Sequence, residues 1–173
     1  NIKKNIPIGS GLGGGSSNAA TTLKALNKLW NMNFSNDKLE KLGKSLGADV
    51  PFFIKGGFQL AEGIGDILSP QKTDILKDLH FLLVTPPIHL STEKAYGSLN
   101  KPLRPIQSHS KFPPVSKPVN WQLFDNDFEN MIGKTYPEIN EIKLTLINTG
   151  ALFSGLSGSG STVFGIFDNL QNA

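Results

Sequence analysis

A glycine-rich segment near the start of the sequence could bind an anion through its backbone. Residues 7–20 read PIGSGLGGGSSNAA, with glycine at positions 9, 11, 13, 14 and 15. Glycine permits positive φ angles and a close approach between the backbone and a ligand. The serine hydroxyls that follow could contact a phosphate or a bound Mg²⁺. These residue types in this order are typical of a phosphate-binding loop.

A helix is predicted directly after the glycines, and a strand directly before them. The helix is indicated by apolar residues at helical spacing, namely Ala19, Leu23, Leu26 and Trp30. The first N–H groups of a helix lack partners within it, and the macrodipole adds partial positive charge at that end. Alternating isoleucines predict the strand, namely Ile2, Ile6 and Ile8. The expected order of strand, glycine loop and helix places the loop where phosphates bind.

The same glycines allow two other interpretations. Gly9, Gly11 and Gly14 have the spacing of a dinucleotide-binding fingerprint, but no second strand with an acidic end follows about 20 residues later. Glycine and serine are also common in flexible linkers. Leu12 inside the run and the helix immediately after it favour the phosphate-binding loop. The Lys-Ser/Thr pair that closes a P-loop is absent.

Asp49 is the carboxylate best placed for acid–base chemistry. Residues 35–46 are predicted to form a helix with Ser35 as its N-cap and Gly47 at its end. Its apolar face is expected to consist of Leu39, Leu42 and Leu46. Asp49 follows, and Pro51 is expected to keep Val50 extended. A carboxylate there could accept a proton from an alcohol, although loop aspartates commonly cap a turn or face water.

Two further segments have residues that could contact a ligand. Gly155, Gly158 and Gly160 alternate with serines before a predicted strand at 162–167, which fits either a ligand contact or a hairpin turn. A strand at 81–84 is followed by a helix expected near Ser91 and Thr92. Thr92 and Tyr96 would share one face of that helix. From its position alone, Tyr96 could be an ordinary residue of an amphipathic helix.

The remaining patterns favour an α+β protein. A helix is expected from Pro137, with Gly150 at its end and Ile139, Ile142 and Leu146 on one face. Helices and strands mix without regular βαβ alternation, which is typical of the α+β class.

Composition narrows the classes of partner. The 173 residues carry 17 basic and 14 acidic side chains without a dense basic run, which argues against a nucleic-acid partner. No apolar run approaches the ~20 residues of a membrane span, and cysteine is absent. We therefore expect a cytoplasmic protein, monomeric or homodimeric, that acts on a small molecule and contacts no membrane.

Four segments together resemble the GHMP kinase family. PIGSGLGGGSSNAA resembles its second signature motif, LGADVPFF at 46–53 its catalytic aspartate segment, and LSGSGSTVFGIF at 156–167 its third motif. Residues 58–68 resemble the strand pair of the family. The resemblance implies a GHMP kinase fold. Residues 1–75 would be the end of a ribosomal-protein-S5-domain-2-like N-terminal domain, and residues 76–173 a truncated ferredoxin-like C-terminal domain.

The resemblance also implies roles for individual residues. ATP would bind to Pro7, Ile8, Gly9, Ser10, Gly11, Leu12, Gly13, Gly14, Gly15, Ser16, Ser17 and Asn18. Ser17 would contact Mg²⁺, and Asp49 would be the general base. The substrate would contact Thr92, Tyr96, Gly158, Ser159 and Gly160. Tyr96 falls where the family has an aromatic residue that stacks on the cytosine of the substrate.

Within the family, the segment GLGGGSSNAA, with Asn18 after the serines, resembles the loop of one branch of enzymes. That branch phosphorylates the 2-hydroxyl of 4-diphosphocytidyl-2-C-methyl-D-erythritol in the non-mevalonate isoprenoid pathway. Other readings are a homoserine or mevalonate kinase-like enzyme and a nucleotide-binding module without catalysis. The family has a lysine in its first motif that pairs with the aspartate, and this sequence has no such motif. We therefore expect the sequence to be an internal fragment without turnover of its own.

Overall fold

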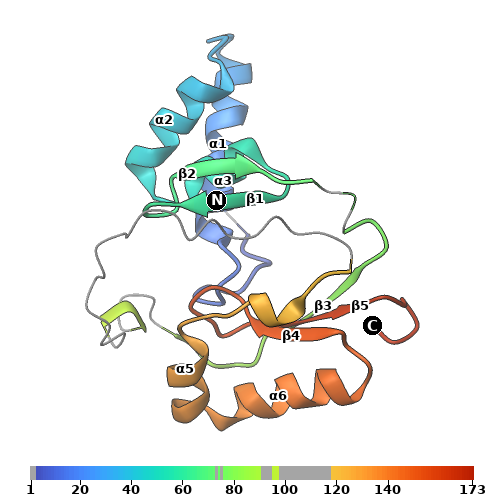
Figure 1. Cartoon of the computed structure of the whole chain (residues 1–173). Helices are drawn as coiled ribbons and strands as arrows, with labels where there is room; N and C mark the ends of the chain where they lie inside the picture. The colour runs from blue at the N-terminus through green and yellow to red at the C-terminus, as the bar shows by residue number, and fades with distance from the viewer. Residues whose placement is uncertain (1–2, 73, 75, 91–94, 98–117) are drawn as a thin grey trace. The chain divides into compact units, whose positions relative to one another are not determined.

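The computed structural model describes residues 3–72, 74, 76–90, 95–97 and 118–173 (Figure 1). Helices and strands are mixed along the chain, so the predicted α+β class is confirmed. The chain divides into two compact units: one comprises Gly13–Asp74, and the other Asn1–Leu12 together with Ile75–Ala173. The predicted domain boundary at residues 75 and 76 stays a prediction.

Three helices and a hairpin make up the unit Gly13–Asp74. The helices are α1 (Gly14–Leu29), α2 (Asn36–Leu46) and α3 (Val50–Lys55). The predicted strand pair is confirmed as β1 (Gln59–Glu62) and β2 (Ile67–Pro70), which are antiparallel. A small core joins the three helices and contains Ala20, Leu39, Val50 and Ile54. Apolar packing therefore holds the three helices together.

The predicted start and end of α2 are confirmed. The backbone N–H of Lys38 donates to Ser35 Oγ at 3.3 Å, and Gly47 is the C-cap. The predicted apolar face is only partly correct, because Leu42 and Leu46 are exposed. Leu39 is buried as predicted, and Gly43 is buried as well. Gly43 allows a close approach, since a Cβ there would lie under 3 Å from side chains of α3.

Replacing the N-cap of α2 gives a first stability prediction. We expect Ser35→Ala to lower the free energy of unfolding by about 1 kcal/mol, because the Lys38 N–H loses its acceptor. Ser45→Ala is the control, since the Ser45 hydroxyl donates only to Leu42 O within the same helix. Urea unfolding of both variants measures the effect. Equal free energies for the two variants would contradict the assignment of the cap.

Two other local expectations are wrong. Trp30 is 63% exposed, because α1 ends at Leu29 and Trp30 is its C-cap rather than part of the apolar stripe. Val50 is not extended: it begins α3, with Pro51 in the first turn and Asp49 as the N-cap. Proline is well tolerated in a first turn, because the N–H it lacks would have no partner there. Asp49 therefore lies at the start of a helix.

The second unit is built on a three-stranded antiparallel sheet. Its strands are β3 (His80–Val84), β4 (Phe153–Leu156) and β5 (Val163–Phe167), in the order β3-β5-β4. Two helices follow one another before β4, α5 (Glu129–Thr135) and α6 (Pro137–Asn148). A 3-10 helix, η2 (Trp121–Leu123), precedes them. The predicted strands at 81–84 and 162–167 and the helix from Pro137 are confirmed to within a residue or two.

The core of this unit lies between α6 and the sheet (Figure 1). Buried residues of the helix, Ile139 and Leu146, pack with Val163 and Phe167 of β5. Ile142, the third member of the predicted apolar face, is half-buried against the same cluster. The aromatic ring of Trp121 stacks on that of Phe153, with 5.9 Å between the ring centroids. Side chains of α6 therefore pack on β5, and Trp121 packs on β4.

The strand predicted before the glycine loop is not formed in residues 3–8. Ile8 is 70% exposed, and Ile6 is exposed as well. A strand needs a hydrogen-bonded neighbour, and none of the described strands pairs with this segment. Pro7 also lacks the N–H that a sheet ladder requires.

Candidate functional site

The N-terminal end of α1 is open. Its N-cap, Gly13, has a left-handed backbone (φ 63°, ψ 22°) and no side chain to cap the helix. The first bond of the helix runs from Ser17 N–H to Gly13 O at 2.9 Å. The N–H groups of Gly14, Gly15 and Ser16 therefore have no acceptor within the helix. A Cβ on Gly15 would meet nothing within 4 Å, so space for an anion exists beside these groups.

Position 13 requires glycine because of its left-handed backbone and also because of the side chain packed against it. A Cβ at this position would lie 2.6 Å from Cζ of Phe53, which belongs to α3. Lys24 of α1 donates from Nζ to the Phe53 carbonyl at 3.1 Å. These contacts fix the start of α1 against α3, the helix that Asp49 caps.

The first half of the glycine loop belongs to the other unit. Gly11 has φ 76°, and a Cβ on it would lie only 2.0 Å from Ser157 O. Ser157 Oγ donates to Gly11 O at 2.9 Å, and Thr162 N–H donates to Ser10 O at 3.0 Å. Ser10 is buried and donates from Oγ to Pro7 O at 2.8 Å. The structure thus brings Ser10 and Gly11 of the second-motif segment together with the predicted glycine turn of the third motif.

The other loop residues differ in exposure. Pro7 and Ile8 are exposed, whereas Leu12, Ser16, Ser17 and Asn18 are half-buried. Gly9 lies against the imidazole of His89, because a Cβ on it would be 2.7 Å from Cε1. Binding of ATP to these residues, and of Mg²⁺ to Ser17, stays a prediction.

The predicted glycine turn connects β4 to β5. Gly158 and Gly160 both have positive φ, 55° and 83°. Gly158 is exposed, whereas Ser159 and Gly160 are buried. The segment is therefore a hairpin connection, and it also contacts the first half of the glycine loop. A role in binding substrate stays a prediction.

Asp49 is exposed at the start of α3. Its side chain does not cap that helix. No ion pair joins it to any residue that the structure describes. The Asp49 carboxylate is therefore available for chemistry rather than held by a structural contact.

Asp66 in the same unit shows the opposite situation. Its carboxylate forms a hydrogen bond and an ion pair with Lys44, which lowers the pKa of Asp66 below its ordinary value. A second contact comes from the N–H of Ile64, at 3.3 Å from Oδ1. Asp66 ties the β1–β2 hairpin to α2, so its role is structural.

The predicted substrate helix is described only at 95–97, and Thr92 lies outside the described residues. Tyr96 is 63% exposed, and its ring meets Phe128 edge-on at 5.0 Å. One edge of the ring is thus held by the protein while much of it faces solvent. Stacking of Tyr96 on a base stays a prediction.

Sequence reasoning missed two residues beside the glycine turn, Asn126 and Glu129. Asn126 Nδ2 donates to Gly158 O at 2.8 Å, and Glu129 Oε1 accepts from Leu156 N–H at 2.7 Å. No spacing rule could have found them, because their partners lie about 30 positions later in the sequence.

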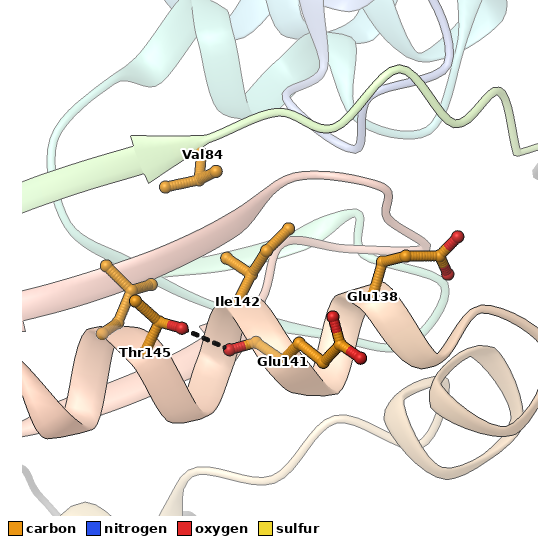
Figure 2. A pocket seen from close by; sticks show the side chains of 6 residues that line it. Val84, Glu138, Glu141, Ile142 and Thr145 are labelled. Atoms are coloured by element: carbon orange, nitrogen blue, oxygen red, sulfur yellow. Dashed lines mark hydrogen bonds between the residues drawn. The ribbon is translucent and has the colours of Figure 1, made fainter.

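A cavity of about 310 Å³ lies between β3 and α6 in the second unit (Figure 2). It is lined by Val84, Glu138, Glu141, Ile142, Thr145 and Leu146. None of these is a predicted site residue. Thr145 Oγ1 donates to Glu141 O at 2.8 Å within α6, as the dashed line shows. The cavity is therefore separate from the glycine segments.

The described part of the chain has neither a cluster of metal ligands nor a membrane-spanning helix. Within the described residues, no three His, Cys, Asp or Glu side chains gather as they would around a metal ion. Of the helices in that part of the chain, none combines the length and the apolar character that crossing a membrane requires.

Comparison with known proteins gives several relatives. One relative from Thermodesulfovibrio yellowstonii is 44% identical over 99% of this chain and 63% of its own length. Another, from Azobacteroides pseudotrichonymphae, is 46% identical over 96% of this chain and 62% of its own. Both are named 4-diphosphocytidyl-2-C-methyl-D-erythritol kinase. The chain thus spans about three fifths of the length of these relatives.

Two solved structures share the fold. A 4-(cytidine 5'-diphospho)-2C-methyl-D-erythritol kinase matches with a TM-score of 0.75 and 29% identity, over 99% of this chain and 62% of that one. A homoserine kinase from Cytophaga hutchinsonii matches with a TM-score of 0.74, over 98% of this chain and 60% of that one. At 19% identity, this second likeness shows the fold alone.

The sequence also matches two domain families of one enzyme group. Residues 1–57 match the GHMP kinases N terminal domain, and residues 113–173 match the GHMP kinases C terminal domain. Together these matches cover more than half of the chain, and the fold agrees with them. The chain belongs to the GHMP kinase family.

Proposed function

We propose that this chain forms part of an ATP-dependent kinase that phosphorylates the 2-hydroxyl of 4-diphosphocytidyl-2-C-methyl-D-erythritol. The observation that carries the proposal is the open start of α1, where three N–H groups have no acceptor within the helix and lie beside a glycine-lined space. Relatives with that activity in their names are 44% and 46% identical over nearly the whole chain. The homoserine kinase likeness extends to the fold only, which favours the first substrate.

The start of α1 fits the phosphates of ATP. Its free N–H groups and the helix macrodipole favour negative charge, and Gly13 to Gly15 present no side chain that would exclude it. Mg²⁺ binds nucleotides with few protein ligands and keeps several waters. The hydroxyl of Ser17 is an oxygen ligand of the kind that Mg²⁺ prefers. When bound, Mg²⁺ would neutralise charge on the phosphates.

Asp49 would act as the general base. It accepts the proton of the substrate 2-hydroxyl while that oxygen forms a bond to the γ-phosphorus. The bond between the γ-phosphorus and the oxygen of the β-phosphate breaks, and ADP leaves with that oxygen. The carboxylate of Asp49 is exposed, does not cap α3 and forms no ion pair with a described residue, which supports this role. Thr92, Tyr96, Gly158, Ser159 and Gly160 would hold the substrate, with the exposed ring of Tyr96 stacking on cytosine.

Two titrations and one chimera test the proposal. ATP should bind to the 173-residue chain and NAD⁺ should not, as measured by isothermal calorimetry. In the chimera, residues 1–173 replace the matching segment of the Thermodesulfovibrio yellowstonii relative. It should release ADP with 4-diphosphocytidyl-2-C-methyl-D-erythritol and not with homoserine. Binding of NAD⁺ in place of ATP would favour a dinucleotide-binding module, and turnover with homoserine would favour the other kinase.

A further inference from the structure

We infer that Asn126 is a positioning residue for nucleotide binding, acting through the β4–β5 glycine turn. Its side-chain amide donates two hydrogen bonds, to Leu156 O at 2.9 Å and to Gly158 O at 2.8 Å. The same side chain accepts from Phe128 N–H at 2.9 Å through Oδ1. Asn126 therefore joins the segment before α5 to both sides of Ser157.

Glu129 strengthens this attachment at the same place. Its Oε1 accepts from Leu156 N–H at 2.7 Å, and its other oxygen is paired with Lys143 of α6. Both polar backbone groups of Leu156 are thus held by side chains from one short segment. Since β4 is an edge strand in the described sheet, these bonds fix an edge that no other described strand covers.

The turn that Asn126 and Glu129 hold also fixes the first half of the glycine loop, which ends at Leu12. Ser157, between the two acceptors of Asn126, donates from Oγ to Gly11 O at 2.9 Å. The Gly11 α-carbon is so close to Ser157 O that a Cβ would lie 2.0 Å from it. Gly158 also lies against Gly11, because a Cβ added to Gly158 would be 3.3 Å from the Gly11 carbonyl oxygen. A change in the turn must therefore move the backbone of the loop.

The inference rests on the proposed function, because it concerns how well the loop accepts ATP. Preorganisation of a loop increases affinity by removing the cost of ordering it on binding. Asn126 touches neither nucleotide nor substrate in this account, and its effect is carried by the turn.

The sharpest variant is Asn126→Asp. A carboxylate at this position still accepts from Phe128 N–H, but it cannot donate to the carbonyls of Leu156 and Gly158. Loss of these two bonds should weaken ATP binding to the 173-residue chain about tenfold. The exchange of the Gly160 N–H, which donates to Ser157 O within the turn, should become faster. Calorimetry and hydrogen exchange measure the two effects.

Asn140→Ala is the matched control. Asn140 lies in the same unit and also donates from Nδ2 to a backbone carbonyl, that of Gly133 at 3.0 Å. Its loss should lower stability without changing the ATP Kd or the exchange of Gly160. Should Asn126→Asp not fold, Asn126→Ser replaces it, because the serine hydroxyl keeps an acceptor and one donor; a smaller loss of affinity is then expected.

The outcomes separate the two proposals. If the unchanged chain does not bind ATP, the proposed function fails and the inference fails with it. If the unchanged chain binds ATP and the folded Asn126 variant binds it equally well, the inference alone is overturned. A loss of affinity as large in Asn140→Ala as in the Asn126 variant would also overturn it, since the effect would then be general destabilisation.

Discussion

Asp49→Asn should reduce phosphoryl transfer by about 10² to 10⁴-fold, the usual contribution of a positioned general base. The amide keeps the shape of the carboxylate but cannot accept the proton of the substrate hydroxyl. Asp49 is exposed and does not cap α3, so the substitution removes no structural hydrogen bond there. ADP release by the chimera with the Thermodesulfovibrio yellowstonii relative measures the change in kcat.

Asp66→Asn is the control for this prediction. Asp66 lies in the same unit, but its carboxylate is engaged by Lys44. This variant should lose some stability while kcat stays within about twofold of the unchanged chimera. ATP should bind to both variants as it does to the parent. A chimera with Asp49→Asn that turns over at the parent rate would exclude Asp49 as the base.

Gly11→Ala is expected to disrupt the glycine loop more than any other single change in it. Gly11 has φ 76°, where a Cβ costs roughly 1–2 kcal/mol. That Cβ would also lie 2.0 Å from Ser157 O, a backbone atom that cannot rotate away. Overpacking of this kind costs about 1–3 kcal/mol more. Urea unfolding should show the loss of stability, and calorimetry should show the loss of ATP binding.

Gly15→Ala is the matched comparison for stability. Gly15 lies within α1, has no positive φ, and an added Cβ would meet nothing within 4 Å. Alanine at this position should raise the free energy of unfolding by about 0.5–1 kcal/mol, because glycine loses more backbone entropy on folding. Identical unfolding curves for the alanine variants of Gly11 and Gly15 would contradict the described packing of the loop.

Local signals in the sequence predicted most of the helices correctly. Ser35 and Pro137 mark helix starts because their caps and φ angles depend on only a few neighbouring residues. The strand expected from Ile6 and Ile8 was wrong because strand formation depends on a distant partner. The expectation that Pro51 keeps Val50 extended was wrong for a different reason. A proline disfavours helical geometry in the residue before it, but it also fits the first turn of a helix.

The candidate site was predictable in its segments but not in its contacts. Residue types and family resemblance identified the glycine loop and the glycine turn separately. That Gly11 lies against Ser157, 146 positions later in the sequence, follows only from the fold. Asn126 belongs to no motif in the sequence, and its proposed role depends on the two distant carbonyls to which its side chain donates.

The central claim is that the open N–H groups at the start of α1 bind the phosphates of a nucleotide. Amide NMR of the 173-residue chain, titrated with a non-hydrolysable ATP analogue and separately with adenosine, tests it most directly. We expect the N–H chemical shifts of Gly14, Gly15 and Ser16 to change with the analogue and to stay unchanged with adenosine. Signals that do not move when the analogue is saturating would contradict it.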